Sequence, residues 1–427
     1  MNKTHTNKSK FSEVTVSRIG IQGDGVANGA GEQYYVPYSA PGDRLLVAPK
    51  KSRKEGQNAK IEQIITEGPD RIEPVCRHFG TCGGCALQHV ADRAVASAKR
   101  EFIVNALESR GFRDVDIKET VTIAAGGRRR VRFSFHKGRV AIVGYRARRS
   151  HHVIDVQECP AIRPAIMALV APLRDLTNTV TAMGRAASLL VTETDSGIDL
   201  LIRPDQEADL SLPDREALAA FADQYDLARI GWEGRSGPEP VAQRRPPRMT
   251  FGTAKIALPL GAFLQPSAAG EACIVNAAGN ALAGATRIAD LFAGCGALTF
   301  PLSSIAPTHA VENDRDMVTA VRSGTATHSV TATERDLAQM PLMPRELESF
   351  DGVVFDPPRA GAKQQAEQLA VSNVATILAI SCNPATLARD LRILADGGYA
   401  IESILPIDQF PWSSHVEAVA ILQRPAA

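Results

Sequence analysis

Short apolar runs alternate with helix-like stretches through the last third of the chain. Residues 375–380 are continuously apolar, which is typical of a parallel strand buried on both faces. Asn383-Pro384 then ends the strand and turns the chain, and residues 386–394 have helical spacing. The pattern predicts an α/β domain built on a parallel sheet. Its candidate strands, in chain order, contain residues 290–291, 309–312, 329–333, 351–355 and 375–380.

The first part of the chain has a different pattern, in which shorter strand-like runs are separated by Gly and Pro turns. Such runs predict a small β-barrel over residues 12–67. Residues 1–11 are polar and contain lysines, so we expect a disordered tail there. The strand-like runs lie at 14–16, 26–27, 34–36, 44–47 and 59–65.

Residues 68–260 combine both patterns and predict a mixed α+β middle domain. A helix is expected over 91–110. Segment 235–248 is rich in Pro, Gly and Arg, and we expect a flexible linker or loop there. The α/β domain then occupies residues 261–427. Strands of the middle domain are expected near 119–124, 131–136, 140–145 and 186–203.

Candidate functional residues follow the ends of the predicted parallel strands, where open α/β sheets place their sites. Gly294 and Gly296 would let the backbone approach a ligand at a helix start. Glu312 ends the second strand, where an acid can bind ribose hydroxyls. Asp356-Pro357-Pro358-Arg359 follows the fourth strand. Cys382 follows the fifth strand. The motifs at the ends of the neighbouring strands favour a nucleophilic cysteine over a buried core thiol.

These motifs resemble the class I S-adenosylmethionine (SAM) methyltransferases. Within that class they are similar to the 5-methyluridine RNA methyltransferase family, the RumA/RlmD and TrmA group. The resemblance extends from about residue 12 to the end of the chain and implies a Rossmann-like fold for the C-terminal domain. It rests on residues 263–265, 290–296, 312, 356–359, 381–390 and 415–417.

The resemblance implies covalent catalysis. Cys382 would add to carbon 6 of a uridine, which makes carbon 5 nucleophilic enough to take a methyl group. Glu417 matches the family's base, which removes the carbon 5 proton so that the thiolate can leave. Asp356 would bind the uracil edge beside Arg359, which stands where amine methyltransferases usually have an aromatic residue. The implied SAM contacts are Gln265, Phe292, Gly294, Gly296, Glu312, Asp336 and Asp356.

Four cysteines upstream suggest a metal site. Cys76, Cys82 and Cys85 lie close together among glycines, and Cys159 lies far downstream. Four thiolates can bind zinc or a 4Fe–4S cluster, and a close triplet with one distant ligand favours the cluster. The resemblance implies the same cluster, for which we expect a structural or RNA-positioning role. The other two cysteines, Cys273 and Cys295, have no assigned role.

Charge is unevenly distributed, although the net charge is only +1. Residues 99–149 hold 14 Lys and Arg against 5 Asp and Glu, a net of +9, whereas residues 285–427 hold 10 against 16, a net of −6. A basic segment can be a solvated face, but beside a predicted RNA enzyme it favours phosphate binding. The arginines concerned are Arg128, Arg129, Arg130, Arg132, Arg146, Arg148 and Arg149.

The N-terminal barrel is similar to the TRAM module, an OB-like RNA-binding barrel. The similarity rests on residues 20–27 and 36–43. Four basic residues in one loop of the barrel favour RNA over a purely structural cap. They are Lys50, Lys51, Arg53 and Lys54.

The sequence therefore predicts a SAM-dependent enzyme that makes 5-methyluridine in 23S ribosomal RNA. Two alternatives stay open, the same reaction on transfer RNA and a non-catalytic RNA-binding ribosome assembly factor. Because no apolar run approaches a membrane-spanning length, we expect a cytoplasmic protein, and nothing demands more than a monomer. The target nucleotide is not specified by these motifs.

Overall fold

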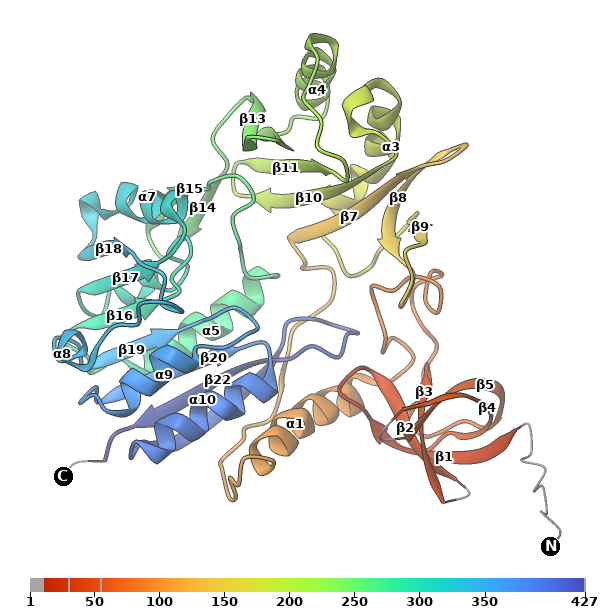
Figure 1. The fold of residues 1–427 in the computed structure, drawn as a ribbon, viewed down its shortest axis with the longest axis horizontal. Coiled ribbons are helices and arrows are strands. Elements are labelled where there is room, and N and C mark those ends of the chain that lie inside the picture. The colour runs from red at the N-terminus through yellow and green to blue at the C-terminus, as the bar shows by residue number, and fades with distance from the viewer. Residues whose placement is uncertain (1–10, 30, 54–55, 426–427) are drawn as a thin grey trace, which may run out of the picture.

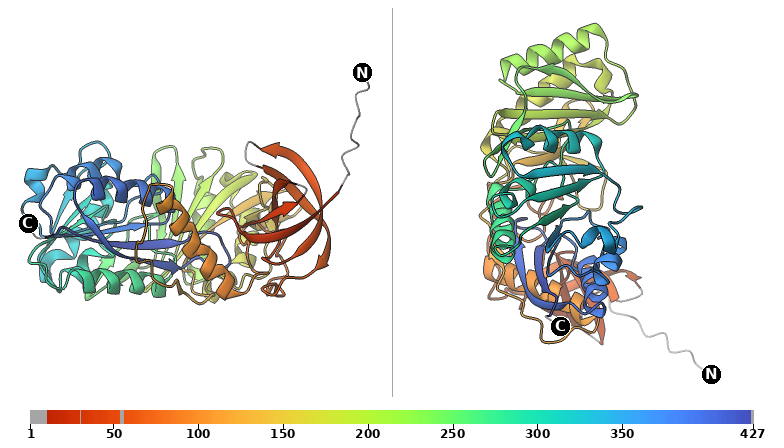
Figure 2. Two further views of the ribbon diagram at one scale, coloured as in Figure 1. Left: turned by 90° about the horizontal axis from the view of Figure 1, so that it is seen from below. Right: turned by 90° about the vertical axis from the view of Figure 1, so that its left-hand side faces the viewer.

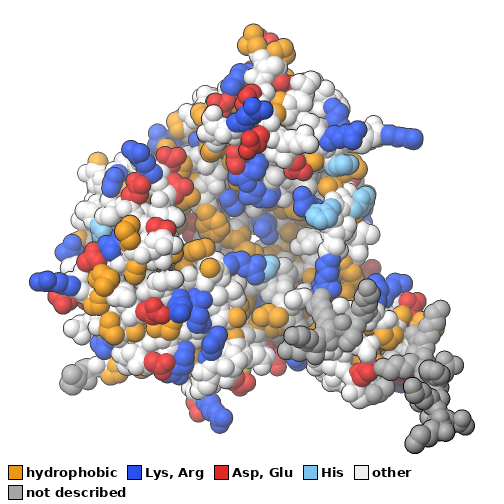
Figure 3. Space-filling model, viewed as in Figure 1, with side chains coloured by type: hydrophobic (Ala, Val, Ile, Leu, Met, Phe, Trp, Pro, Cys, Tyr) orange, Lys and Arg blue, Asp and Glu red, His pale blue; other side chains and the backbone are white. Residues whose placement is uncertain are grey.

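The computed structural model describes residues 11–29, 31–53 and 56–425 of the 427-residue chain. Three lobes surround a hollow (Figures 1 and 3). In the view from below, the barrel and the C-terminal α/β lobe lie at opposite ends of the molecule (Figure 2). Except for Phe11, the predicted tail lies outside the described residues, as do Lys54 and the side chains of Lys51 and Arg53.

The N-terminal lobe is a closed five-stranded barrel, as predicted. Apolar side chains at alternate positions fill it, among them Val14, Val16 and Val36. Closure pairs the strands around the barrel in the order β1-β2-β3-β5-β4, which leaves no open edge. The strands are β1 Ser12–Ile19, β2 Asp24–Gly29, β3 Glu32–Pro37, β4 Arg44–Arg53 and β5 Gly56–Thr66.

The middle lobe is a seven-stranded sheet of order β13-β12-β11-β10-β7-β8-β9. Its helices pack on the sheet through one apolar core that includes Leu173, Leu218 and Phe133. The strands are β7 Arg130–Lys137, β8 Ala141–Arg146, β9 Val153–Asp155, β10 Ala186–Thr194, β11 Gly197–Pro204, β12 Arg229–Gly234 and β13 Gly237–Gln243, and the helices are α2 Pro164–Ala168, α3 Val170–Thr179, η1 Thr181–Met183 and α4 Leu212–Gln224.

The prediction of a flexible linker over 235–248 is wrong, because β13 lies within this segment. A two-residue turn joins β12 to β13, and Gly237 has a φ of 92° next to it. Pro238 and Pro240 cannot donate to a sheet ladder, but β13 lies at the edge of the sheet, where proline is tolerated. Pro and Gly thus mark an edge strand here.

The C-terminal lobe is an eight-stranded sheet of order β18-β17-β16-β19-β20-β22-β21-β6, with helices on both faces (Figure 1). Strands β16 to β20 are parallel, and β22 runs antiparallel to β20 and β21. The strands are β16 Ile288–Leu291, β17 Thr308–Glu312, β18 Val330–Glu334, β19 Gly352–Phe355, β20 Thr376–Ser381, β21 Ala400–Asp408 and β22 Glu417–Gln423, and the helices are α5 Ala268–Ala281, α6 Thr299–Leu302, α7 Arg315–Ser323, η2 Thr325–Thr327, α8 Pro344–Leu347, α9 Lys363–Ala370 and α10 Pro384–Asp396.

Two segments outside 261–427 pack on this lobe. Helix α1, Asp92–Glu108, shares a core with α10 through Ile103 and Leu107, and β6, Val121–Thr122, extends the sheet beside β21. The hairpin of β14, Arg248–Phe251, and β15, Ala254–Ala257, packs on the α7 side. The C-terminal lobe therefore includes segments that precede the predicted boundary at residue 261, because the apolar faces of these segments pack on the C-terminal sheet. Among the described residues, no helix is long and apolar enough to cross a membrane.

Candidate active site

A cavity of about 1130 Å³ lies where the three lobes meet. Parallel strands bring the residues that follow β16, β17, β19 and β20 to one edge of the sheet, and all of these line the cavity. The barrel contributes Gln22, and the middle lobe contributes the four predicted metal-ligating cysteines. The cavity thus collects the predicted catalytic, cofactor and cysteine residues, which come from distant parts of the chain.

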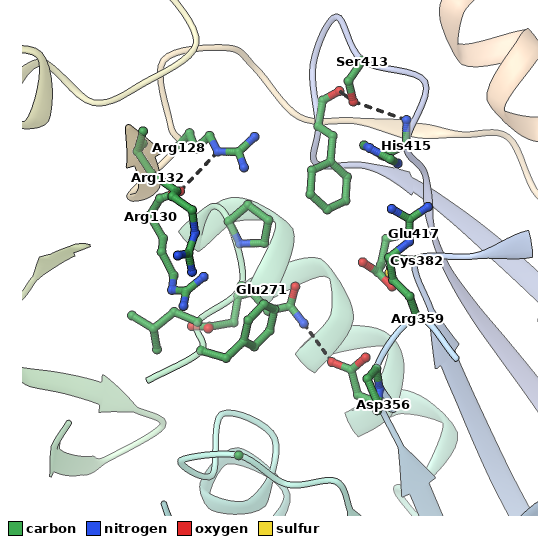
Figure 4. Close-up of a pocket in the computed structure, with 18 of the residues that line it drawn as sticks. Arg128, Arg130, Arg132, Glu271, Asp356, Arg359, Cys382, Ser413, His415 and Glu417 are labelled. Atoms are coloured by element: carbon green, nitrogen blue, oxygen red, sulfur yellow. Dashed lines mark hydrogen bonds between the residues drawn. The ribbon is translucent and has the colours of Figure 1, made fainter. Parts of the chain in front are cut away.

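Cys382 and Glu417 lie next to each other at this edge (Figure 4). Ser381 of β20 pairs with Ala418 of β22 in an antiparallel register. The next residue outward on each strand is Cys382 and Glu417, so the register itself sets them opposite one another. Glu417 is buried.

The electrostatics of this pair favour neutral forms. Burial raises the pKa of Cys382 to about 11; the negative charges of Glu417 and Asp356 raise it further, whereas Arg359 lowers it. Burial also raises the pKa of Glu417 well above its ordinary value, and the charge of Asp356 adds to this. A thiol in this setting must lose its proton to an acceptor before it attacks.

A chain of two amides joins Asp356 to Glu417. Gln265 Nε2 donates to Asp356 Oδ2 at 2.8 Å, and Gln409 Nε2 donates to Gln265 Oε1 at 2.9 Å. Gln409 Nε2 also donates to Glu417 Oε2 at 3.0 Å. Burial raises the pKa of Asp356 to about 6, and the bond from Gln265 opposes this rise. The two carboxylates are therefore linked through hydrogen bonds that each accepts.

The glycine loop and Glu312 form the other end of the cavity. Gly294 and Gly296 have φ angles of 54° and 88°, and a Cβ on Gly296 would lie 2.7 Å from the ring of Phe300. The Gly294 N–H donates to Glu312 Oε2 at 2.9 Å, which fixes this acid beside the loop. Phe292 and Asp336 line the same region. The arrangement offers a backbone cradle and a carboxylate at a strand end, which suits a nucleoside ligand.

The four upstream cysteines line the cavity near the middle lobe. Burial raises the pKa of Cys82, of Cys159 and of Cys85, the last to about 12, and the charges of neighbouring cysteines raise them further. The Gly84 N–H donates to Cys82 Sγ at 3.4 Å. Over residues 11–29, 31–53 and 56–425, no group of three or more candidate ligands is close enough to hold a metal ion. The thiols are thus neighbours without forming a compact single-ion site.

Arginines line the cavity wall opposite Cys382. Arg128, Arg130 and Arg132 lie together there (Figure 4). Burial lowers the pKa of Arg130 to about 10, and the charges of Arg132 and Arg128 lower it further. The Arg130 guanidinium lies over the Phe263 ring, 5.5 Å from its centroid. This concentration of positive charge suits a polyanion.

Three other arginines of the basic segment are held by acids. Arg148 and Arg149 pair with Asp24 of the barrel at 2.7 and 2.9 Å. The buried Arg129 pairs with Glu271 at 2.6 Å. These ion pairs fasten the barrel and α5 to the middle lobe, so these three arginines have a structural role that the charge count did not reveal.

Comparison with known proteins shows the family to which this chain belongs. The profile of the tRNA (Uracil-5-)-methyltransferase family matches residues 305–425. An uncharacterized RNA methyltransferase of Brucella suis is 41% identical over 421 residues, 97% of this chain and 99% of that protein. The 23S rRNA (uracil(1939)-C(5))-methyltransferase RlmD of Halomonas elongata is 33% identical over 436 residues, 97% of this chain and 89% of that protein. The chain belongs to the RNA (uracil-5-)-methyltransferase family.

The fold agrees with this family. The tRNA (uracil-54, C5)-methyltransferase of Pyrococcus abyssi, solved with S-adenosyl-L-homocysteine, superposes with a TM-score of 0.73 at 21% identity, covering 96% of this chain and 100% of that one. The predicted class I α/β fold with an N-terminal barrel is therefore confirmed. Membership of a methyltransferase family supports SAM as the methyl donor.

One residue of the site, Gln409, was missed by the sequence analysis. It follows the apolar strand β21, which runs parallel to β20 because both are antiparallel to β22. Its position after a buried strand is the same signal that singled out Asp356 and Cys382. The sequence analysis predicted no strand over 400–408, so this position was not singled out.

Proposed function

We propose that this RNA uracil-5-methyltransferase modifies a uridine of 23S ribosomal RNA through a covalent adduct on Cys382. The observation that carries the mechanism is the β20–β22 register, which sets a thiol opposite a buried carboxylate in the cavity that also holds the glycine loop. The substrate rests on the RlmD relative, which is 33% identical across nearly the whole chain. Transfer RNA stays the second candidate, because the matching family profile is described by that substrate.

In the proposed reaction, bound SAM supplies the methyl group. The Cys382 thiolate forms a bond to carbon 6 of uracil, and carbon 5 takes the methyl group. Asp356 and Arg359 are proposed to orient the uracil edge, and Gln265 donates a hydrogen bond to Asp356. Glu417 then removes the proton from carbon 5, the carbon 5–carbon 6 double bond re-forms, and the thiolate leaves. The residues proposed to hold the cofactor are Gln265, Phe292, Gly294, Gly296, Glu312, Asp336 and Asp356.

RNA would enter along the arginine wall. Arg128, Arg130 and Arg132 supply the positive charge, and a uridine inside folded RNA must leave its stack to reach Cys382. The barrel and the middle lobe flank this path, which suits a role in holding the RNA. A TRAM-like function for the barrel is part of the same proposal.

Cys76, Cys82, Cys85 and Cys159 are proposed to bind a 4Fe–4S cluster, which would tie segments distant in the chain together. Support comes from the donor set: four thiols line one region, and backbone N–H groups and Tyr145 donate to the Cys159 sulfur. The described residues contain no group of three or more candidate ligands placed to hold a metal ion, so the proposal rests on the donor set alone. Cys273 and Cys295 remain without a role.

The deciding experiment is SAM-dependent methylation of separated, unmodified 23S, 16S and transfer RNA, with the product identified by mass spectrometry. We expect 5-methyluridine in 23S RNA. The same nucleoside in transfer RNA alone would keep the mechanism and replace the substrate. No methylation of any RNA, with SAM still bound, would favour the non-catalytic assembly factor.

A further inference from the structure

We propose that Gln409 is a positioning residue that holds Glu417 by its Oε2 atom, so that Oε1 is the atom that receives the carbon 5 proton. This inference rests on the proposed role of Glu417 as the base. It assigns a function to a side chain that touches neither the reacting cysteine nor, in the proposed arrangement, the uracil ring.

The contacts of Gln409 use both protons of its amide. Gln409 is 3% exposed, and its Nε2 lies 3.0 Å from Glu417 Oε2 and 2.9 Å from Gln265 Oε1. If the amide were turned over, Gln409 Oε1 would face two acceptors, and a buried site penalises such a contact. The network therefore fixes the amide with its nitrogen towards Glu417.

The orientation of Gln409 decides what each oxygen of Glu417 can do. Oε2 accepts a hydrogen bond from Gln409, which holds this oxygen in place and occupies one of its two lone pairs. Oε1 is buried and has no hydrogen-bond partner within residues 11–29, 31–53 and 56–425. A free lone pair on a fixed carboxylate is what proton abstraction requires. We therefore assign proton abstraction to Oε1, the oxygen whose lone pairs are both free of hydrogen bonds from the described residues.

The step balances without any further reactant. After methyl transfer, carbon 5 carries the methyl group and one proton, and carbon 6 is bonded to the Cys382 sulfur. Oε1 takes the proton, and the electron pair of that C–H bond forms the carbon 5–carbon 6 double bond. The carbon 6–sulfur bond breaks, and its electron pair leaves with the thiolate. Gln409 changes no bond and acts only through the orientation of Glu417.

Helix α5 packs against the Gln409 side chain. Gly270 of α5 lies against its amide, and a Cβ at that position would be 2.4 Å from Gln409 Oε1. A side chain at this position would therefore force the Gln409 side chain or the start of α5 to shift. Gly270→Ala therefore gives a second way to disturb Gln409 without changing its chemistry.

Gln409 also affects the proton affinity of Glu417. Its hydrogen bond favours the charged carboxylate, against burial and the charge of Asp356, which raise the pKa of Glu417. Loss of this bond would raise that pKa further, so proton abstraction would need a higher pH. The titratable groups around Glu417 are Asp356, Cys382, Arg359 and His415 along the cavity, and Glu271 of α5, whose carboxylate pairs with Arg129.

The test measures how fast the methylated protein–RNA adduct releases its product, in single-turnover experiments on the full chain. In Gln409→Met, which keeps the volume and removes both donors, adduct formation should persist and release should slow by on the order of tenfold. The rising limb of the release rate against pH should move to higher pH. Gly270→Ala should act in the same direction and carries the test if Gln409→Met does not fold. Gln423→Met, on the same strand as Glu417 but at its far end, should release product at the wild-type rate.

Glu417→Gln separates this inference from the proposed function. If Glu417→Gln traps the adduct while both Gln409→Met and Gly270→Ala release product at the wild-type rate with an unmoved pH profile, the role of Gln409 is overturned and the base stands. If Glu417→Gln releases product normally, the base itself is wrongly assigned, and the inference falls with it.

Discussion

Cys382 and Glu417 stand opposite each other because β20 and β22 pair in antiparallel register, with Ser381 against Ala418. A shift of one residue would turn Glu417 to the other face of the sheet. The buried residues of β22, Ala418 to Ala420, fix this register through the apolar cores on the two faces. The spacing of Cys382 and Glu417 is therefore a property of the sheet rather than of a loop.

Removal of the nucleophile should abolish chemistry without abolishing binding. In Cys382→Ala we expect SAM and RNA affinities close to those of the wild type and no detectable methyl transfer, because carbon 5 of uracil is too weak a nucleophile unaided. Cofactor binding by calorimetry and tritium transfer to RNA measure the two properties. Turnover in this variant would show that the adduct forms elsewhere or not at all.

Removal of the base should stop the reaction one step later. In Glu417→Gln the amide cannot take the carbon 5 proton, so the methylated RNA should remain bonded to Cys382. A denaturing gel should show a protein–RNA band that carries the labelled methyl group. A band without label would instead place Glu417 before methyl transfer.

Arg359 should control the reactivity of Cys382. Its positive charge lowers the pKa of the thiol, against burial and two carboxylates that raise it. In Arg359→Ala the pKa should rise, so less thiolate is present at any given pH and alkylation by iodoacetamide should slow by up to about tenfold. Peptide-resolved mass spectrometry distinguishes Cys382 from the other thiols. Arg392→Ala, a half-buried arginine paired with Asp396, is the control, and equal effects in both variants would contradict the prediction.

A buried ion pair should hold α1 on the C-terminal lobe. Lys99 Nζ lies 2.5 Å from Asp408 Oδ1, and its side chain is fully buried. Lys99→Met leaves Asp408 as an unpaired buried charge, and we expect a loss of about 3–5 kcal/mol in the free energy of unfolding. Urea denaturation measures this loss. Lys118→Met breaks the exposed pair with Asp116 and should cost less than about 1 kcal/mol, so similar losses in both would refute the prediction.

The segment that contains Cys76, Cys82 and Cys85 should influence the methylation rate through a backbone contact. The N–H groups of Ala86 and Leu87, just after Cys85, donate to the carbonyl oxygen of Trp412 at 2.8 and 2.9 Å. Trp412 lies in the loop between Gln409 and Glu417. Anaerobically purified protein should contain about four iron and four sulfide per chain, and Cys85→Ser should lose both and lower the methylation rate. Stoichiometric zinc without iron would contradict the cluster.

The site was predictable wherever a functional side chain directly follows a buried strand. Asp356 and Cys382 carry this local signal, and parallel strands bring such positions to one edge. Gln409 carries the signal as well, but its partners Gln265 and Glu417 depend on the direction of β21. Arg148 and Arg149 show the opposite case. The sequence showed that their segment is basic, but it did not show that both side chains pair with Asp24 of the barrel.

The sequence by itself determined the order of the three lobes, the closed barrel, the parallel strands and the chemical types at the strand ends. The signals that predict them, hydrophobic periodicity and turn residues, act over only a few positions of the chain. Only the tertiary structure decided that α1 and β6 join the C-terminal sheet, that β13 is an edge strand, and that Gln409 holds Glu417. Each of these features depends on contacts between apolar faces or polar groups that are far apart in the sequence. Packing, rather than local propensity, decides which of those contacts form.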